Sequence, residues 1–167
     1  MLTAEQRNIY EIVIDSVDNA KGLLLSIDAC GGSGKTFLLT TILARVRSQR
    51  HIALATATSG IAATLLPNGR TLHSRLKVPI NIDEHSSCNV DGRSSTARLL
   101  SLCKLLVIDE VHVTMAHRNV YEAIDRSLRD VRRKTLRWFN CCVFRRLETN
   151  PARCQEGFAR GRHRRLL

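Results

Sequence analysis

Two groups of residues in this sequence have the types and the spacing to act on a phosphate. The first is the segment GGSGKT, in which Lys35 and Thr36 follow a glycine-rich turn. Backbone N–H groups of such a turn can approach an anion, and the helix that follows adds its positive end. A lysine at this position reaches terminal phosphates as a point charge, and a threonine hydroxyl is a magnesium ligand. The segment therefore predicts a phosphate-binding loop.

The second group is Asp109 and Glu110, which end the apolar run LLVI. Beside bound phosphates, the first acid would hold magnesium through water, and the second would orient and deprotonate an attacking water. An apolar strand that ends in two acids is, taken alone, often only a strand end. Because it follows a glycine-rich phosphate loop in the same chain, the pair indicates nucleotide hydrolysis.

Short apolar strands alternate with helices around these residues, which predicts an α/β fold with a parallel sheet and a site at the carboxyl edge of the strands. Thr3 and Gln6 form the pattern of a capping box, so a helix should begin there, and Lys21 and Gly22 should end it. Glycine and polar residues make 79–96 an irregular surface loop. Strands are expected at 23–27, 51–55 and 105–108. Further helices are expected at 35–49, 97–103 and 116–133.

Hydroxyl-bearing residues follow the second predicted strand: Thr56, Thr58 and Ser59, with His73 further on. Such side chains suit sugar-phosphate contacts, which position a nucleic acid strand without reading its sequence. The alternative is that Ser59 caps a short helix and that the other residues are ordinary turn polarity. The spacing leaves both readings open.

Composition narrows the class of protein. The 167 residues suit one domain, and no run of eighteen apolar residues predicts a membrane span. The N-terminus lacks the pattern of a secretory signal. The six cysteines have no metal-ligand or redox-pair spacing, so we interpret them as reduced thiols of an intracellular protein. The other histidines also show no metal-ligand spacing. The net charge is +11, but residues 134–167 hold 9 Lys and Arg against 2 Asp and Glu, so most of it lies in the last fifth of the chain.

Five motifs in order resemble the Pif-one-type ATP-dependent DNA helicases, most closely their helitron-like branch. They are LTAEQ, GGSGKT, ATATSGIAATLLPNGRTLHSRLKVPI, LLVIDE and MAHRNVYEAIDRSLRDVR, and they cover residues 2 to about 133. The resemblance implies a P-loop NTPase domain of the RecA-like type, the first of two motor domains. It also implies a 5'-to-3' helicase that hydrolyses ATP with Mg²⁺ to move on single-stranded DNA, acting in DNA repair, recombination or telomere maintenance in the nucleus or the mitochondrion.

The resemblance assigns roles residue by residue. Lys35, Asp109 and Glu110 resemble the catalytic residues, and Thr36 and Asp109 the magnesium ligands. Gln6 resembles the glutamine that reads adenine. The phosphate loop corresponds to Gly31, Gly32, Ser33, Gly34, Lys35 and Thr36. The residues that resemble DNA-contacting motifs are Thr58, Ser59, Gly60, Thr71, His73 and Ser74.

The chain departs from the family pattern at three places. Ala29 and Cys30 replace the usual start of the loop, and the segment after Glu110 is about two residues longer than in the family. From Lys134 onward the sequence is Arg-rich and lacks the family's strand and GDxRQ motif. Back-translation with a shift of one nucleotide permits KPFGGLTVVFSGDLRQTLPV, so we hypothesise that 134–167 is an out-of-frame, poorly ordered tail. Resequencing the locus around codon 133 tests this, and a clean in-frame read rejects it.

This departure has a physical consequence. In the family the strand before GDxRQ lies between the loop strand and the Asp-Glu strand, and without it the backbone groups of both neighbours lack partners. The segment 138–144 is apolar enough to fill that gap by accident, and if it does not, we expect a marginally stable domain. The second motor domain and its arginine finger have no counterpart here, and losing such an arginine costs on the order of 10³ or more in rate. We therefore expect that this chain alone does not unwind DNA.

Two alternatives remain. Another P-loop nucleotide protein is possible, although the chain has no N-K-x-D guanine reader, and the paired arginines of a kinase lid would have to come from the tail. The other is a non-enzymatic basic protein whose Arg-rich C-terminus binds nucleic acid. Deleting 134–167 separates them: a loss of nucleic-acid affinity with unchanged ATP binding would favour the basic protein.

Overall fold

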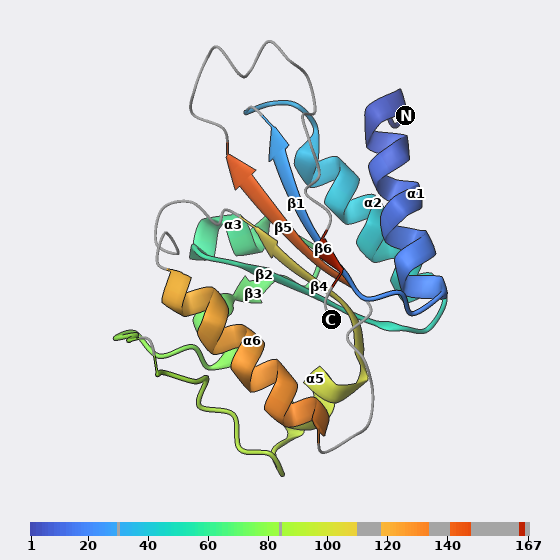
Figure 1. The fold of residues 1–167 in the computed structure, drawn as a ribbon. Coiled ribbons are helices and arrows are strands. Elements are labelled where there is room, and N and C mark those ends of the chain that lie inside the picture. Colours follow the sequence, from blue (N-terminus) through green and yellow to red (C-terminus); the bar gives the residue numbers. More distant parts are fainter. Residues whose placement is uncertain (30, 84, 110–117, 134–140, 148–163, 166–167) are drawn as a thin grey trace.

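The computed structural model describes residues 1–29, 31–83, 85–109, 118–133, 141–147 and 164–165. Within these residues the chain forms one six-stranded sheet in the order β3-β2-β4-β5-β1-β6 (Figure 1). Strands β1 to β5 pair in parallel, and β6 runs antiparallel to β1. The strands are β1 Leu23–Ala29, β2 Ile52–Ala57, β3 Arg70–Thr71, β4 Cys103–Asp109, β5 Cys141–Leu147 and β6 Arg164–Arg165.

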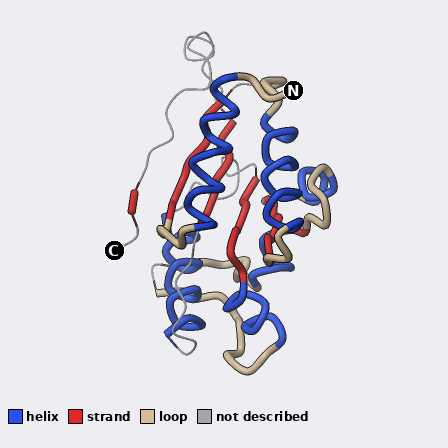
Figure 2. The backbone as a smooth tube through the Cα atoms, turned by 90° about the vertical axis from the view of Figure 1, so that its right-hand side faces the viewer, coloured by secondary structure: helices blue, strands red, loops and turns tan. Residues whose placement is uncertain are grey.

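Helices cover both faces of this sheet, as the two perpendicular views show (Figures 1 and 2). Helices α1 Ala4–Asp18 and α2 Lys35–Ser48 cover one face, and α4 Leu72–Leu76, α5 Ser95–Leu102 and α6 Arg118–Arg133 cover the other. The short helix α3 Gly60–Thr64 follows β2. Two large apolar cores result among the described residues, one on each side of the strands, with a small third cluster between β2 and α3. This arrangement confirms the predicted α/β fold.

Alternation along the strands explains how one sheet serves two cores. In β1, Leu23, Leu25 and Ile27 are buried in the core beneath α1 and α2, whereas Leu24 packs in the opposite core. Successive side chains of a strand point to opposite faces, so an apolar strand covered on both sides reads as a continuous hydrophobic run. Strand β4 is buried along almost its whole length for the same reason.

The predicted start of α1 is confirmed in detail. The Thr3 hydroxyl accepts from the backbone N–H of Gln6 at 3.2 Å, and the Gln6 side-chain oxygen accepts from the N–H of Thr3 at 3.1 Å. The helix ends at Asp18, three residues before the predicted stop at Lys21 and Gly22. The other predicted strands and helices are present with ends shifted by up to two residues within the described part of the chain.

The predicted irregular loop is also found, since no helix or strand occurs among the described residues between Leu76 and Ser95. It is less peripheral than its polarity indicated. Cys88 is buried, and its backbone N–H donates to the Ser127 hydroxyl of α6 at 2.7 Å. Burial raises the pKa of the Cys88 thiol. One cysteine therefore anchors the middle of this loop to the core.

Strand β5 occupies the centre of the sheet, between β4 and β1. Leu25 of β1 and Val107 of β4 both align with Val143. This is the position at which the family's strand before GDxRQ was expected, and Cys141–Leu147 from the basic tail supplies the strand. The proposed boundary at residue 133 and the reading-frame hypothesis for 134–167 stay predictions.

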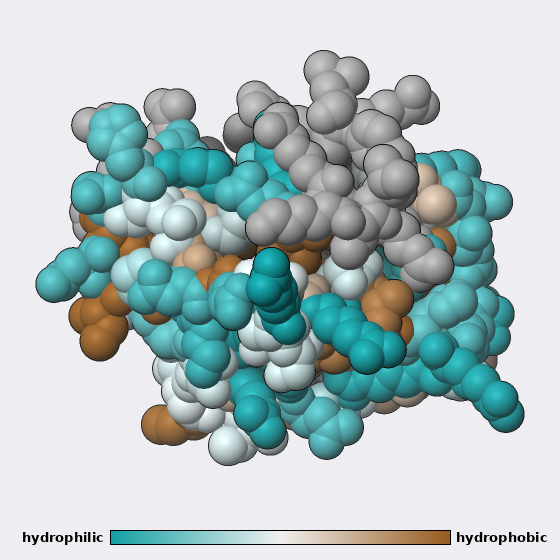
Figure 3. Space-filling view, turned by 90° about the horizontal axis from the view of Figure 1, so that it is seen from below, coloured by the Kyte–Doolittle hydropathy of each residue, from teal (hydrophilic) through white to brown (hydrophobic). Residues whose placement is uncertain are grey.

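Several large apolar side chains are exposed on the described surface. Seen from below, that surface is largely hydrophilic, with separate hydrophobic patches (Figure 3). No helix among the described residues has both the length and the apolar character needed to cross a bilayer. The largest exposed apolar residues are Met1, Phe37, Ile61, Leu65, Ile80 and Leu102.

The turn after α3 depends on a glycine. A Cβ placed on Gly69 would lie 2.1 Å from the backbone oxygen of Ala63 and 3.1 Å from Leu66 Cβ. We expect Gly69→Ala to lower the free energy of unfolding by about 1–3 kcal/mol, the usual cost of overpacking, in urea denaturation. Gly60→Ala is the matched control, because a Cβ there meets nothing within 4 Å. Equal stability of Gly69→Ala and wild type would contradict this account of the turn.

Candidate functional site

The predicted phosphate-binding loop joins β1 to α2. Gly32 and Gly34 both have left-handed backbone conformations, with φ of 74° and 77°. Such a φ is costly for residues with a side chain, which is why glycine occupies these positions. Gly34 is the N-cap of α2, and no side chain caps this helix end by a hydrogen bond. The first turn of α2 therefore presents its backbone N–H groups and its positive end toward the loop.

Lys35 begins α2 and is buried, with 4% of its surface exposed. Its ammonium group donates to the Ser33 hydroxyl at 3.0 Å, across the turn of the loop. A buried lysine keeps its charge only if strong acceptors surround it. The ammonium group is thus already directed into the loop, where phosphate oxygens would be stronger acceptors than a hydroxyl.

Asp109 ends β4 and is fully buried. Ile108 of β4 and Ser26 of β1 both align with Phe144 of β5, so Asp109 lies one step beyond them, level with Ile27. Because β5 lies between them, β4 and β1 are two inter-strand spacings apart, about 9.6 Å. Because β1, β5 and β4 are parallel, Asp109 and the phosphate loop lie at the same edge of the sheet. The predicted juxtaposition of loop and acid is therefore present, whereas Glu110 lies outside the described residues.

Gln6 links α1 to the phosphate loop, which was not anticipated from its place in a capping box. Its side-chain NH₂ donates to the backbone oxygen of Ser33 at 3.0 Å, while its side-chain oxygen accepts from Thr3. The residue is 4% exposed, and a Cβ added to Gly34 would lie 2.9 Å from its nitrogen. One amide therefore fixes both the helix end and the path of the loop. Sequence spacing does not show that Gln6 lies close to Gly34, so the link between Gln6 and the loop could not be predicted from the sequence.

The residues with resemblance to DNA-contacting motifs lie at the carboxyl ends of β2 and β3. Thr58, Ser59 and Gly60 lead from β2 into α3, and Thr71, His73 and Ser74 lead from β3 into α4. The hydroxyl of Ser59 accepts from the N–H of Ala62 at 3.1 Å, and that of Thr71 from the N–H of Ser74 at 3.3 Å. The capping alternative is thus observed for Ser59. Ser59, Gly60, His73 and Ser74 are nevertheless exposed.

A backbone hydrogen bond joins the two sets of residues. The N–H of Thr58 donates to the backbone oxygen of Asp109 at 3.2 Å. Two residues before Thr58, within β2, the buried Thr56 hydroxyl donates to the backbone oxygen of Val107 at 2.8 Å. The backbone of the acid that ends β4 is therefore hydrogen-bonded to Thr58, the first residue of the segment that resembles a DNA-contacting motif.

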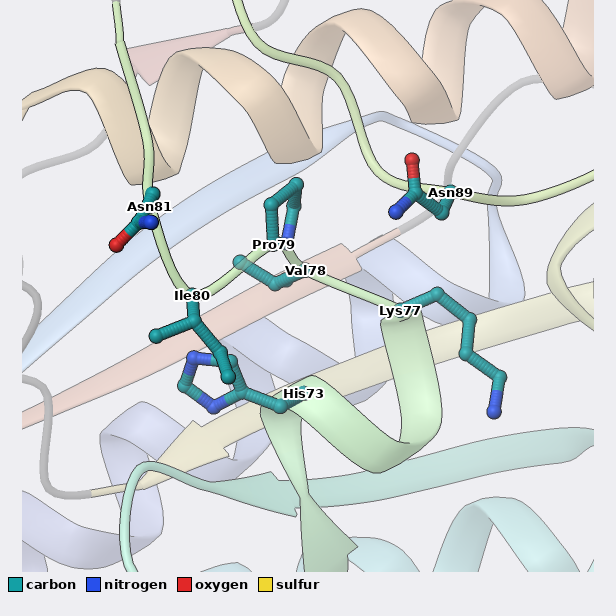
Figure 4. Close-up of a pocket in the computed structure, with 7 residues that line it drawn as sticks. All are labelled: His73, Lys77, Val78, Pro79, Ile80, Asn81 and Asn89. Atoms are coloured by element: carbon teal, nitrogen blue, oxygen red, sulfur yellow. The ribbon is translucent and has the colours of Figure 1, made fainter.

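A hollow of about 480 Å³ lies next to His73 (Figure 4). In the close-up the His73 ring and Ile80 lie side by side, with Asn81 on the adjoining loop and Asn89 across from them. Ile80 is 91% exposed. No residue pattern predicted this hollow, which is formed by residues of α4 and of the loop that follows it. Its lining comprises His73, Lys77, Val78, Pro79, Ile80, Asn81 and Asn89.

The described residues contain no group of three or more His, Cys, Asp or Glu placed to hold a metal ion. His51 and His85 belong to this part of the chain, whereas His112, His117 and His163 lie outside it. A magnesium ion between phosphates and protein needs only one or two protein oxygens, with substrate and water supplying the others. Thr36 and Asp109 provide a hydroxyl and a carboxylate at the same sheet edge, so the donor set fits such an ion.

The comparisons with known proteins agree with this arrangement. The family model for PIF1-like helicases matches residues 1–141. The chain belongs to the PIF1-like helicase family. It is 29% identical over 132 residues to the ATP-dependent DNA helicase PIF4 of Trypanosoma brucei brucei, and 30% identical over 121 residues to the ATP-dependent DNA helicase Pif1 of Psychrobacter. These matches cover 77% and 71% of this chain but only 15% and 18% of the two helicases.

Solved structures of Pif1 helicases share this fold. Pif1 helicase from Bacteroides in complex with ADP-AlF3 and ssDNA matches with a TM-score of 0.69 at 26% identity, over 89% of this chain and 32% of that one. Pif1 helicase from Candida albicans matches with a TM-score of 0.65 at 20% identity, over 86% and 32%. The predicted resemblance to Pif-one-type helicases and the RecA-like P-loop fold are therefore confirmed, whereas the helitron-like branch stays a prediction.

The bridge made by Gln6 can be tested separately from its helix cap. Gln6→Glu keeps the oxygen that accepts from Thr3 but places a carboxylate oxygen against the Ser33 carbonyl in place of the N–H donor. We expect affinity for a fluorescent ATP analogue to fall by about 5- to 10-fold, the worth of one buried hydrogen bond. Thr3→Ala is the control: loss of the cap should lower stability by about 1 kcal/mol and leave affinity unchanged. Wild-type affinity in Gln6→Glu would exclude the bridge as a determinant of the loop.

Proposed function

We propose that this chain forms the ATP-binding motor domain of a 5'-to-3' ATP-dependent DNA helicase that moves on single-stranded DNA. The observation that supports this most directly is the position of the Lys35 loop and Asp109 at one edge of a parallel sheet, joined by hydrogen bond to Thr58. The chain spans less than a fifth of the curated helicases it matches. The activity of the whole protein therefore belongs to this proposal.

In the proposed mechanism the loop binds the triphosphate through backbone N–H groups and the first turn of α2. Lys35 transfers its hydrogen bond from the Ser33 hydroxyl to a terminal phosphate oxygen and neutralises its charge. Thr36 and Asp109 would hold Mg²⁺, which would supply positive charge next to the phosphates. Glu110 would accept a proton from the attacking water. Gln6 orients the loop and, by resemblance, contacts adenine.

Coupling to DNA follows from the connection between β4 and β2. Any displacement of the Asp109 backbone during hydrolysis acts on the N–H of Thr58, because the two are hydrogen-bonded at 3.2 Å. Thr58 leads directly into the exposed Ser59 and Gly60. Single-stranded DNA would lie over this segment and over Thr71, His73 and Ser74. The nucleotide state would thereby change the position of the DNA-contacting turns.

The cellular setting of the proposal derives from the resemblance alone. DNA repair, recombination or telomere maintenance in the nucleus or the mitochondrion is the setting we propose.

Lys35 is the decisive residue for nucleotide binding. Lys35→Met retains most of the apolar stem but removes the ammonium group, so we expect affinity for Mg²⁺-ATP to fall by about 10- to 100-fold, the worth of hydrogen bonds to charged groups. Isothermal titration calorimetry on the 167-residue chain measures this. The control is Lys77→Met, which removes one charge from an exposed residue after α4. Equal ATP affinity of the Lys35 variant and wild type would remove the assignment.

Substitution of Asp109 tests whether its carboxylate contributes to magnesium binding. Asp109→Asn has nearly the same shape but lacks the charge, so we expect ATP binding to lose most of its dependence on magnesium concentration. Titrations at low and high Mg²⁺ give this difference. A magnesium dependence that is unchanged in Asp109→Asn would show that the carboxylate does not contribute to the metal site.

A further inference from the structure

Three arginines from separate elements meet around the turn Pro67–Gly69. Arg47 comes from the last turn of α2, Arg70 from β3 directly after the turn, and Arg75 from α4. Arg70 and Arg75 belong to the segment 55–80 quoted above, but none of the three arginines carries one of the roles assigned there. Their neighbour Thr71 and the residues His73 and Ser74 do, so this arginine cluster borders the segment that we propose to contact DNA.

Arg47 fixes the turn. Its guanidinium donates to the backbone oxygen of Ala53 from Nε at 3.2 Å and from Nη2 at 2.9 Å, and to the oxygen of Pro67 from Nη1 at 2.9 Å. A guanidinium has five N–H donors, so three contacts leave part of this capacity unused. Arg47 is thus a positioning residue that also contributes a positive charge.

Arg75 reaches the next carbonyl along the chain. Its Nη2 donates to the oxygen of Asn68 at 3.1 Å, and its Nε is buried without a hydrogen-bond partner. Since Pro67 and Asn68 are consecutive, with Cα atoms about 3.8 Å apart, the guanidinium groups of Arg47 and Arg75 converge on one short stretch of backbone. Within the described residues Nη1 of Arg75 has no hydrogen bond, so this group still has donors for an external acceptor.

The positive charges of the arginine cluster are not balanced by an ion-paired carboxylate among the described residues. The pKa of Arg75 is lowered first by burial and then by the positive charges of Arg70 and Arg47. Across the described residues, no Asp or Glu forms an ion pair with any of the three arginines. Like charges held together raise each other's energy, and an anion would reverse this. Arg70 is exposed and makes no hydrogen bond through its side chain within the described part of the chain, so it can reach a ligand without breaking a contact.

We propose that Arg70 and Arg75, supported by Arg47, bind a backbone phosphate of single-stranded DNA next to the Thr71–Ser74 turn. The inference rests on the proposed DNA contact of that turn and extends it along the edge of the sheet. Arginine suits phosphate because its planar donors match two oxygens at once. Contacts of this kind set the position of the strand without selecting its sequence.

Salt dependence of DNA binding tests the site. Each phosphate neutralised on a single strand contributes about 0.7 to the slope of log affinity against log salt. We expect Arg70→Ala and Arg75→Gln each to reduce this slope by about 0.7, measured by fluorescence anisotropy with a dT oligonucleotide on the 167-residue chain. Arg45→Ala is the matched control, since Arg45 is an exposed arginine of the same helix as Arg47. Its slope should equal that of wild type. Thermal unfolding of each variant verifies that it is folded.

Other outcomes overturn the proposal. Equal slopes in wild type, Arg70→Ala and Arg75→Gln exclude a phosphate contact. Equal losses in all three variants, Arg45→Ala included, show only the effect of net charge. His73→Ala separates this inference from the proposed function. If His73→Ala weakens binding while the Arg70 and Arg75 variants do not, the DNA contact holds and the arginine site fails. If wild type does not bind the oligonucleotide, both fail.

Discussion

The site depends on a strand that lies between its two halves. Strands β1 and β4 do not pair with each other; each pairs with β5, which sets their relative height. The phosphate loop follows β1, and Asp109 ends β4, so their separation is fixed by two backbone ladders rather than by contact between side chains. A slip of one residue in either ladder would turn the strand's side chains to the opposite face. The central ladders thus determine whether a phosphate and a carboxylate can share an ion.

The sequence was informative where local chemistry decides structure. Capping by Thr3 and the glycine-rich approach to Lys35 appeared as predicted, because caps and left-handed turns need particular residue types within a few positions. It was uninformative where tertiary contacts decide. The two-residue strand β3 is too short for periodicity to show, and the burial of Cys88 depends on Ser127, thirty-nine residues away. The link from Gln6 to the phosphate loop is of the same kind.

Several polar side chains of the site also stabilise the fold by hydrogen bonds to the backbone. Ser59 and Thr71 cap helices, and Gln6 both caps α1 and holds the backbone of Ser33. Capping and ligand binding are therefore not exclusive readings of one residue type. A hydroxyl that accepts from a backbone N–H can still donate to a phosphate oxygen, since it carries one donor and two acceptor sites. Structural and binding roles can coexist at these turns.

The late position of β5 in the chain bears on how the molecule forms. Residues 23–109 provide every other parallel strand, yet the centre of the sheet stays open until residues 141–147 arrive. During synthesis β1 and β4 would each present an unsatisfied edge, and such edges pair readily with other chains. Joining strands this distant in sequence is also slow, because the intervening chain must be ordered first. Chaperone dependence and aggregation during expression would arise from this topology rather than from low stability of the finished fold.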